Sequence, residues 1–123
     1  MDVKHLQARF EKLDWQQQLG NLASTLARVS SRASLPEHDR LVIDLLQEAA
    51  LFIEWGAPRV PSTFLLELAT MQKEVLAWKQ VWPLEAARPL LTLYARNRSD
   101  RLLEMAELMG PRRPDRFPRS TPA

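Results

Sequence analysis

Few residues of this chain have the types and the spacing that catalysis or metal binding requires. The two histidines, His5 and His38, belong to no HExxH or ExxH pattern, so they do not predict a metal site. Acidic pairs such as Asp44 with Glu48 fall on polar helix faces among arginines. General acid–base catalysis instead needs carboxylates that converge in a desolvated pocket. We therefore expect neither a metal site nor catalytic carboxylates.

The sequence also shows no motif for a catalytic nucleophile or for a cofactor-binding loop. The chain has no cysteine, which excludes thiolate nucleophiles, disulfides and cysteine-ligated metals. Its serines cluster where helices are expected to begin or end, and none stands in a G-x-S-x-G pattern. The three glycines are scattered, so no phosphate-binding loop is predicted. We expect a protein that is not an enzyme and that needs no cofactor.

The tryptophans are the residues that best predict binding. There are four in 123 residues, and Trp78 and Trp82 fall on an apolar helical stripe, where core packing is the first explanation. An indole also carries an N–H donor and is enriched at protein interfaces. The candidate partner-binding residues are Trp55, Trp78, Trp82 and Leu84.

Arginines form the second candidate site. Arg88, Arg96, Arg98 and Arg101, together with Arg112, Arg113, Arg116 and Arg119 near the C-terminus, could make a basic strip for phosphate contacts. The alternative is a solvated helix face on which Arg101 pairs locally with Asp100 or Glu104. Residues 110–123 carry a net charge of +3, from four arginines and one aspartate, whereas residues 1–109 carry −1. The basic character therefore belongs to the C-terminal segment.

Apolar periodicity predicts helices along residues 1–109. The clearest stripe, with steps of three and four residues, consists of Trp15, Leu19, Leu22, Leu26, Val29 and Ala33. A shorter stripe precedes it and loses phase at Asp14, which can form an N-terminal capping box with Gln17. Similar stripes predict helices from Ser62 to Trp82 and from residue 85 onward. The last segment could be one helix or two that break at "RNRS".

The joints between these helices carry recognisable end signals. Ser34 is expected to cap a helix that runs to Trp55, with Pro36 in its first turn. Gly56 is expected to end that helix in the left-handed conformation, and Pro58 prevents its continuation. Pro83 marks the next boundary.

The sequence thus predicts an all-α protein, a small antiparallel bundle of four to five helices in residues 1–109. Residues 110–123 are rich in arginine and proline, and we expect them to be a disordered tail. This tail would either keep the chain soluble or act as a basic arm that binds a partner. The start of the chain is charged, and no stretch approaches about 18 apolar residues, so we expect a cytoplasmic protein with no membrane contact.

The function expected from these observations is non-catalytic protein binding, as an adaptor, regulator or assembly factor. The partner would be another protein, whose identity stays open. Leu51 and Leu66 lie off the main stripes and could widen the docking surface or form the face of a homodimer. Nucleic-acid binding through the basic strip is the alternative, although only Tyr94 interleaves with its arginines.

Overall fold

Five α-helices account for most of residues 2–108, the part of the chain that the computed structural model describes. They are α1 (Val3–Glu11), α2 (Trp15–Arg32), α3 (Asp39–Gly56), α4 (Leu65–Val81) and α5 (Arg88–Leu108). The described residues contain no strand, and none of their helices could cross a membrane. The predicted all-α class is confirmed. The predictions for residues 110–123, including their four arginines, lie outside the described residues.

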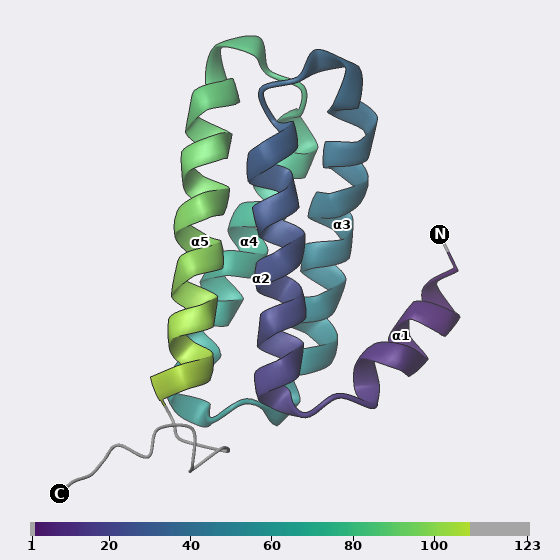
Figure 1. The fold of residues 1–123 in the computed structure, drawn as a ribbon, viewed down its shortest axis with the longest axis vertical. Helices are drawn as coiled ribbons and strands as arrows, with labels where there is room; N and C mark the ends of the chain where they lie inside the picture. Colours follow the sequence, from purple (N-terminus) through teal and green to yellow (C-terminus); the bar gives the residue numbers. More distant parts are fainter. Residues whose placement is uncertain (1, 109–123) are drawn as a thin grey trace, which may run out of the picture.

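Helices α2 to α5 form an antiparallel bundle, and α1 leans away from its base (Figure 1). Consecutive helices of the bundle run in opposite directions, as their short connections predict. Helix α2 stands between α5 and α3, and α4 packs on α3 behind them. The order around the bundle therefore brings together α2 and α5, which are distant in sequence.

The apolar stripes seen in the sequence make the core. The largest side chains with almost no exposure come from all four bundle helices: Leu22, Leu26, Leu46, Leu68, Met71, Leu91, Leu102 and Met105. Between α2 and α5 the contact residues include the small Ala23 and Ser99, which let the two backbones approach closely. The Ser99 hydroxyl donates to the Ala23 carbonyl oxygen at 2.8 Å, and Ser30 donates to that of Thr92 at 2.8 Å.

The predicted break before Trp15 is confirmed. Asp14 is the N-cap of α2, and its carboxylate accepts a hydrogen bond from the Gln17 backbone N–H at 2.8 Å. The Gln17 side chain in turn accepts from the Asp14 backbone N–H at 3.1 Å. This reciprocal box satisfies two donors that a helix start otherwise leaves unpaired.

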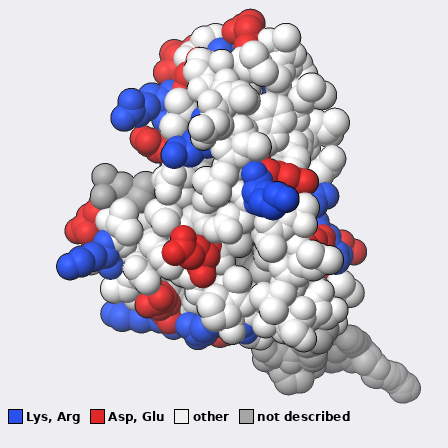
Figure 2. Space-filling model, turned by 180° about the vertical axis from the view of Figure 1, so that it is seen from behind, with Lys and Arg blue, Asp and Glu red and all other residues white. Residues whose placement is uncertain are grey.

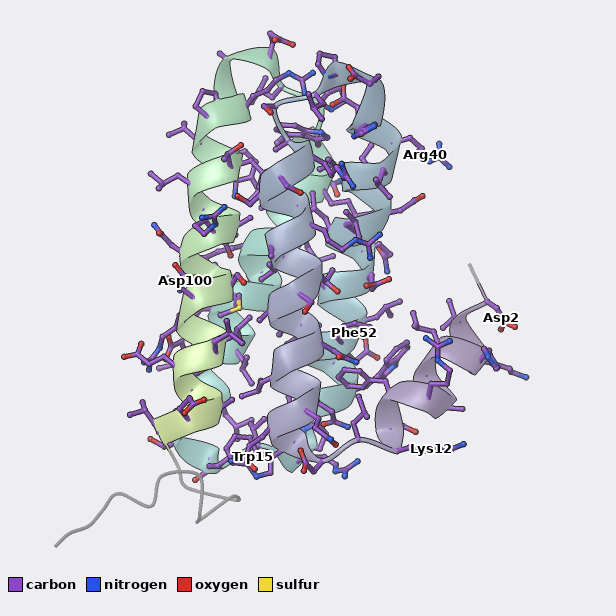
Figure 3. All side chains as sticks on the ribbon, viewed as in Figure 1. Asp2, Lys12, Trp15, Arg40, Phe52 and Asp100 are labelled. Atoms are coloured by element: carbon purple, nitrogen blue, oxygen red, sulfur yellow. The ribbon has the colours of Figure 1, made fainter. Side chains whose placement is uncertain are left out.

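Helix α1 is attached through one buried ring. Phe10 is its single buried residue and stacks on Phe52 of α3, with ring centroids 4.4 Å apart. Figure 3 shows Phe52 reaching from α3 toward α1. The Arg59 guanidinium donates to the carbonyl oxygens of Glu11 and Leu13 at 3.1 and 3.2 Å, which secures the link between α1 and α2.

Two of the predicted helix ends are wrong. Ser34 caps no helix, because a 3-10 turn over Pro36–His38 intervenes and α3 begins at Asp39. Gly56 is right-handed, with φ −90° and ψ −26°, and α3 passes directly into a second 3-10 turn, Ala57–Arg59. Pro58 fits the first positions of such a turn, where its missing N–H costs nothing. The chain leaves the helical region only at Val60, which is extended.

The open question about the last helix is resolved in favour of one helix. Helix α5 continues through "RNRS" to Leu108. Ser99, within that sequence, is buried and bonded across to α2, so its position is explained by helix packing rather than by a helix end. The third predicted helix begins slightly later than expected, because Ser62–Phe64 forms a 3-10 turn before α4.

Candidate functional site

The candidate tryptophans lie at opposite ends of the bundle. Trp78 and Trp82 lie near the end of α4, with ring centroids 6.3 Å apart, and Leu84 follows in the turn to α5. Trp55 lies near the end of α3, where its ring packs at 6.0 Å from those of Phe10 and Phe52. The structure therefore groups three of the four predicted partner-binding residues and leaves Trp55 apart.

Burial separates those three residues further. Trp82 is only 5% exposed, and its ring lies beneath the Arg88 guanidinium, 5.2 Å from ring centroid to Arg88 Cζ. Trp78 is half-buried and packs against Trp82 and Tyr94. Leu84 is exposed. The two tryptophans thus pack beneath the surface at this end of the molecule, and Leu84 is the one exposed residue of the three.

A continuous run of the chain around Leu84 exposes apolar side chains, and we call it the 81–93 surface. Its exposed members are Val81, Pro83, Leu84, Ala86, Pro89, Leu90 and Leu93. Leu90 and Leu93 are the most exposed leucines among them, at 60% and 58%. Between residues 80 and 95 the single exposed charge is Glu85, because Arg88 is buried. In Figure 2 the upper right part of the molecule, over the end of α4 and the start of α5, is correspondingly almost free of charged side chains.

The outward side of α5 changes character half-way along. Near its start the exposed residues are Pro89, Leu90 and Leu93, followed by the polar Arg96 and Asn97. The second half exposes Leu103 and Leu108 among the charged Asp100, Glu104 and Glu107. Figure 3 shows Asp100 pointing away from the bundle. Only the start of this helix therefore exposes two leucines with no exposed charge between them. Sequence reasoning missed Leu90 and Leu93, although the crowded "RPLLTLYA" holds more apolar residues than one buried face needs.

A groove of about 650 Å³ adjoins the 81–93 surface between α2 and α5. The lining residues are Ser30 and Ser34 from the α2 side and Glu85, Arg88, Pro89, Thr92, Leu93 and Arg96 from the α5 side. Among these, Glu85 and Arg96 are exposed and of opposite charge. The groove is thus apolar along α5, with an acidic group at the turn and a basic group further along the helix.

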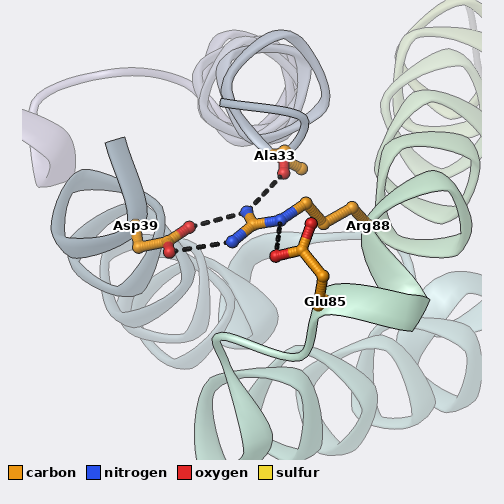
Figure 4. A network of polar contacts seen from close by, with 4 residues as sticks. All are labelled: Ala33, Asp39, Glu85 and Arg88. Carbon is orange, nitrogen blue, oxygen red and sulfur yellow. Dashed lines mark hydrogen bonds and ion pairs between the residues drawn. The ribbon is translucent and has the colours of Figure 1, made fainter. Parts of the chain in front are cut away.

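An ion-pair network centred on the buried Arg88 fixes the end of the bundle that carries this surface (Figure 4). The Arg88 guanidinium binds the Asp39 carboxylate through two hydrogen bonds of 2.8 and 3.0 Å, and its Nε donates to Glu85 at 2.9 Å. It also donates to the Ala33 carbonyl oxygen at 3.0 Å. These contacts join the end of α2 and the starts of α3 and α5. Hydrogen bonding from Arg88 lowers the pKa of Asp39, and the two carboxylates raise the pKa of Arg88.

The two helices α4 and α5 are joined by polar contacts. The Tyr94 hydroxyl donates to Glu74 at 2.8 Å, and burial of the phenol, assisted by this carboxylate, raises its pKa. Arg101 binds Glu67 through hydrogen bonds of 2.7 and 3.0 Å, which lower the pKa of Glu67. Arg101 also donates to Glu104 at 3.0 Å, the local pairing that the sequence offered as an alternative to a basic strip.

The helical arginines of the predicted strip are distributed over several environments. Arg88 is in the buried network, Arg101 is paired with two carboxylates, and Arg98 is half-buried with its guanidinium 5.9 Å from the Tyr94 ring centroid. Arg96 is exposed and forms no ion pair with another described residue. Within residues 2–108, Arg96 is therefore the one helical member of the strip that presents an exposed, uncompensated charge.

The part of the chain that the structure describes contains no cluster of three potential metal ligands. Comparison of the sequence with protein-family models, with curated proteins and with solved structures finds no match. The 81–93 surface, with the adjoining groove, is the candidate site that the geometry favours.

Proposed function

We propose that the protein is a non-catalytic protein-binding module, an adaptor, regulator or assembly factor, whose docking site is the 81–93 surface. The observation that carries the proposal is the exposure of several large apolar side chains in a region whose single exposed charge is Glu85, with Leu90 and Leu93 the most exposed leucines. Large contiguous apolar patches are uncommon on the surfaces of monomeric proteins and mark interaction sites. Burying them against a partner would recover the free energy lost by keeping them in water.

Rigidity beneath this surface supports the proposal. The Arg88 network and the rings of Trp78 and Trp82 hold the turn and the start of α5 in place. A surface already held in its binding conformation loses less conformational entropy when a partner docks. The dispersed and largely paired arginines of α5 favour this function over phosphate binding, which would need several free cations on one face.

A matched pair of variants on one helix tests the proposal. Leu93→Asp places a charge in the 81–93 surface, whereas Leu103→Asp places the same charge at a similarly exposed leucine, 49% exposed, in the charged half of α5. Tagged full-length protein would be used to capture partners from source-cell lysate after nuclease treatment. We expect Leu93→Asp to reduce capture at least tenfold and Leu103→Asp to leave it within about twofold.

Circular dichroism of both variants should show an unchanged helical fold, because both side chains are exposed. Equal capture by wild type and Leu93→Asp would remove the 81–93 surface as the docking site. Loss of capture on nuclease treatment alone would instead favour nucleic-acid binding.

A further inference from the structure

The 81–93 surface has the charge arrangement of a surface that binds its own copy. We infer that its partner is a second copy of this chain, packed through the first half of α5 about a two-fold axis. This inference rests on the proposed docking surface and specifies what occupies it. A two-fold interface is isologous: if residue i of one copy contacts residue j of the other, j of the first also contacts i of the second. Such a surface must therefore be complementary to itself.

Opposite charges flank the apolar centre of this surface. Glu85 precedes α5 in the turn, and Arg96 lies eleven residues further along the chain, roughly 17 Å along a helix. The Glu85 side chain is 81% exposed, and its bond to Arg88 uses only Oε1. Arg96 is exposed and has no ion pair within residues 2–108. The Arg96 guanidinium and the second carboxylate oxygen of Glu85 are thus available to a partner, and both residues line the same groove.

The charged pair and the leucine pair have nearly the same centre. The midpoint between Glu85 and Arg96 falls between residues 90 and 91, and the midpoint between Leu90 and Leu93 falls one residue later. That offset corresponds to about 1.5 Å along the helix, which two long charged side chains can span. If a second α5 crosses the first in the antiparallel direction at this centre, leucine faces leucine and each Glu85 faces the other copy's Arg96.

The composition of the surface suits such a contact. An interface of ordinary size covers about 800 Å² on each partner, with an apolar centre and a polar rim. The total accessible surface of the chain is 7128 Å², so a contact of that size would cover roughly a ninth of it. The leucines, the flanking prolines and the groove wall supply an apolar centre, and Glu85 and Arg96 supply the rim.

Charge reversal tests the arrangement directly. Sedimentation velocity of the full-length chain, from about 1 to about 100 µM, would measure the dimer dissociation constant for wild type, Glu85→Lys and Arg96→Glu. Each single variant creates two like-charge contacts across the axis, and we expect each to weaken the dimer roughly tenfold. An equimolar mixture of the two variants should restore dimerisation, because both contacts across the axis of the mixed dimer then join opposite charges. In one contact the two introduced side chains face each other, and in the other the two native side chains do.

The control is Arg40→Glu, which reverses a charge on α3 whose side chain is 87% exposed and projects away from the bundle (Figure 3). It should dimerise like wild type. Thermal melts would identify a variant that fails to fold, and restoration in the mixture itself requires both variants to be folded. Restoration supports the inference. A monomeric wild type, or a mixture no stronger than its components, overturns it.

These results are separable from the test of the proposed function. A monomeric wild-type chain whose capture of another protein is abolished by Leu93→Asp would refute self-association and leave the docking surface in place. A dimer that neither Leu93→Asp nor the charge reversals weaken would lie on another face and would refute this inference.

Discussion

Truncating Leu102 to alanine should destabilise the protein far more than the same truncation at Leu103. Leu102 is completely buried in the core, whereas its neighbour is 49% exposed on the same helix. Removing three carbon atoms from a fully buried leucine loses about 2.4 kcal/mol of transfer free energy at ~0.8 kcal/mol per methylene. The cavity that remains raises the cost to about 3–4 kcal/mol. For Leu103→Ala the same reasoning gives about 1 kcal/mol or less.

Urea unfolding followed by circular dichroism measures both free energies of unfolding, and an unchanged denaturant slope confirms that the unfolding transition is comparable. The corresponding decreases in Tm are roughly 12–16 °C for Leu102→Ala and under about 4 °C for Leu103→Ala. The comparison is sensitive to the rotation of α5, since a shift of one residue turns the helix by about 100°. Equal losses, or a larger loss for Leu103→Ala, would refute the orientation of α5 and with it the exposure of Leu93.

Two further predictions concern the ends of the bundle. The lowered pKa of Asp39 means that its pairing with Arg88 stabilises the fold fully above about pH 4 and is lost as pH falls through that lowered pKa. Asp39→Asn should therefore lower Tm at pH 7 and show a smaller decrease in Tm than wild type between pH 4 and pH 2; parallel curves would contradict this. Phe10→Ala should cost about 3 kcal/mol or more and selectively remove the hydrogen-exchange protection of α1. Uniform loss of protection through α2 to α5 would show that α1 is not a separate unit, and Val3→Ala, at an exposed site, is the control.

The core could be predicted from sequence because it depends on local periodicity. Leu19, Leu22 and Leu26 repeat at helical spacing, and each is buried as its position in the stripe indicates. The start of α2 was equally local, since the capping box involves only Asp14 and Gln17. Where the contacts that determine a helix or its end lie within one or two helical turns, the sequence predicts the observed structure.

The errors arise where distant parts of the chain decide the conformation. Gly56 suggested a left-handed helix end, yet its backbone is right-handed and it is buried, where a Cβ would lie at ordinary contact distance from the Gln18 and Phe10 side chains. These neighbours belong to other segments, and a single-sequence pattern does not reveal them. For Trp82 core packing was the first explanation, and the ring is buried, but the sequence does not reveal that it lies beneath Arg88, which is itself bound to Asp39.

The sequence of the candidate docking surface contains more leucines than the buried stripe of α5 requires. The buried side of α5 needs only one apolar stripe, which Leu91, Ala95 and Leu102 supply with almost no exposure. Leu90 and Leu93 add nothing to that stripe, and a polar residue at either position would be compatible with the same helix. The fold therefore does not account for these two leucines, whereas the proposed partner would bury them. We therefore expect a substitution at Leu93 to remove the proposed docking while the helical bundle stays folded.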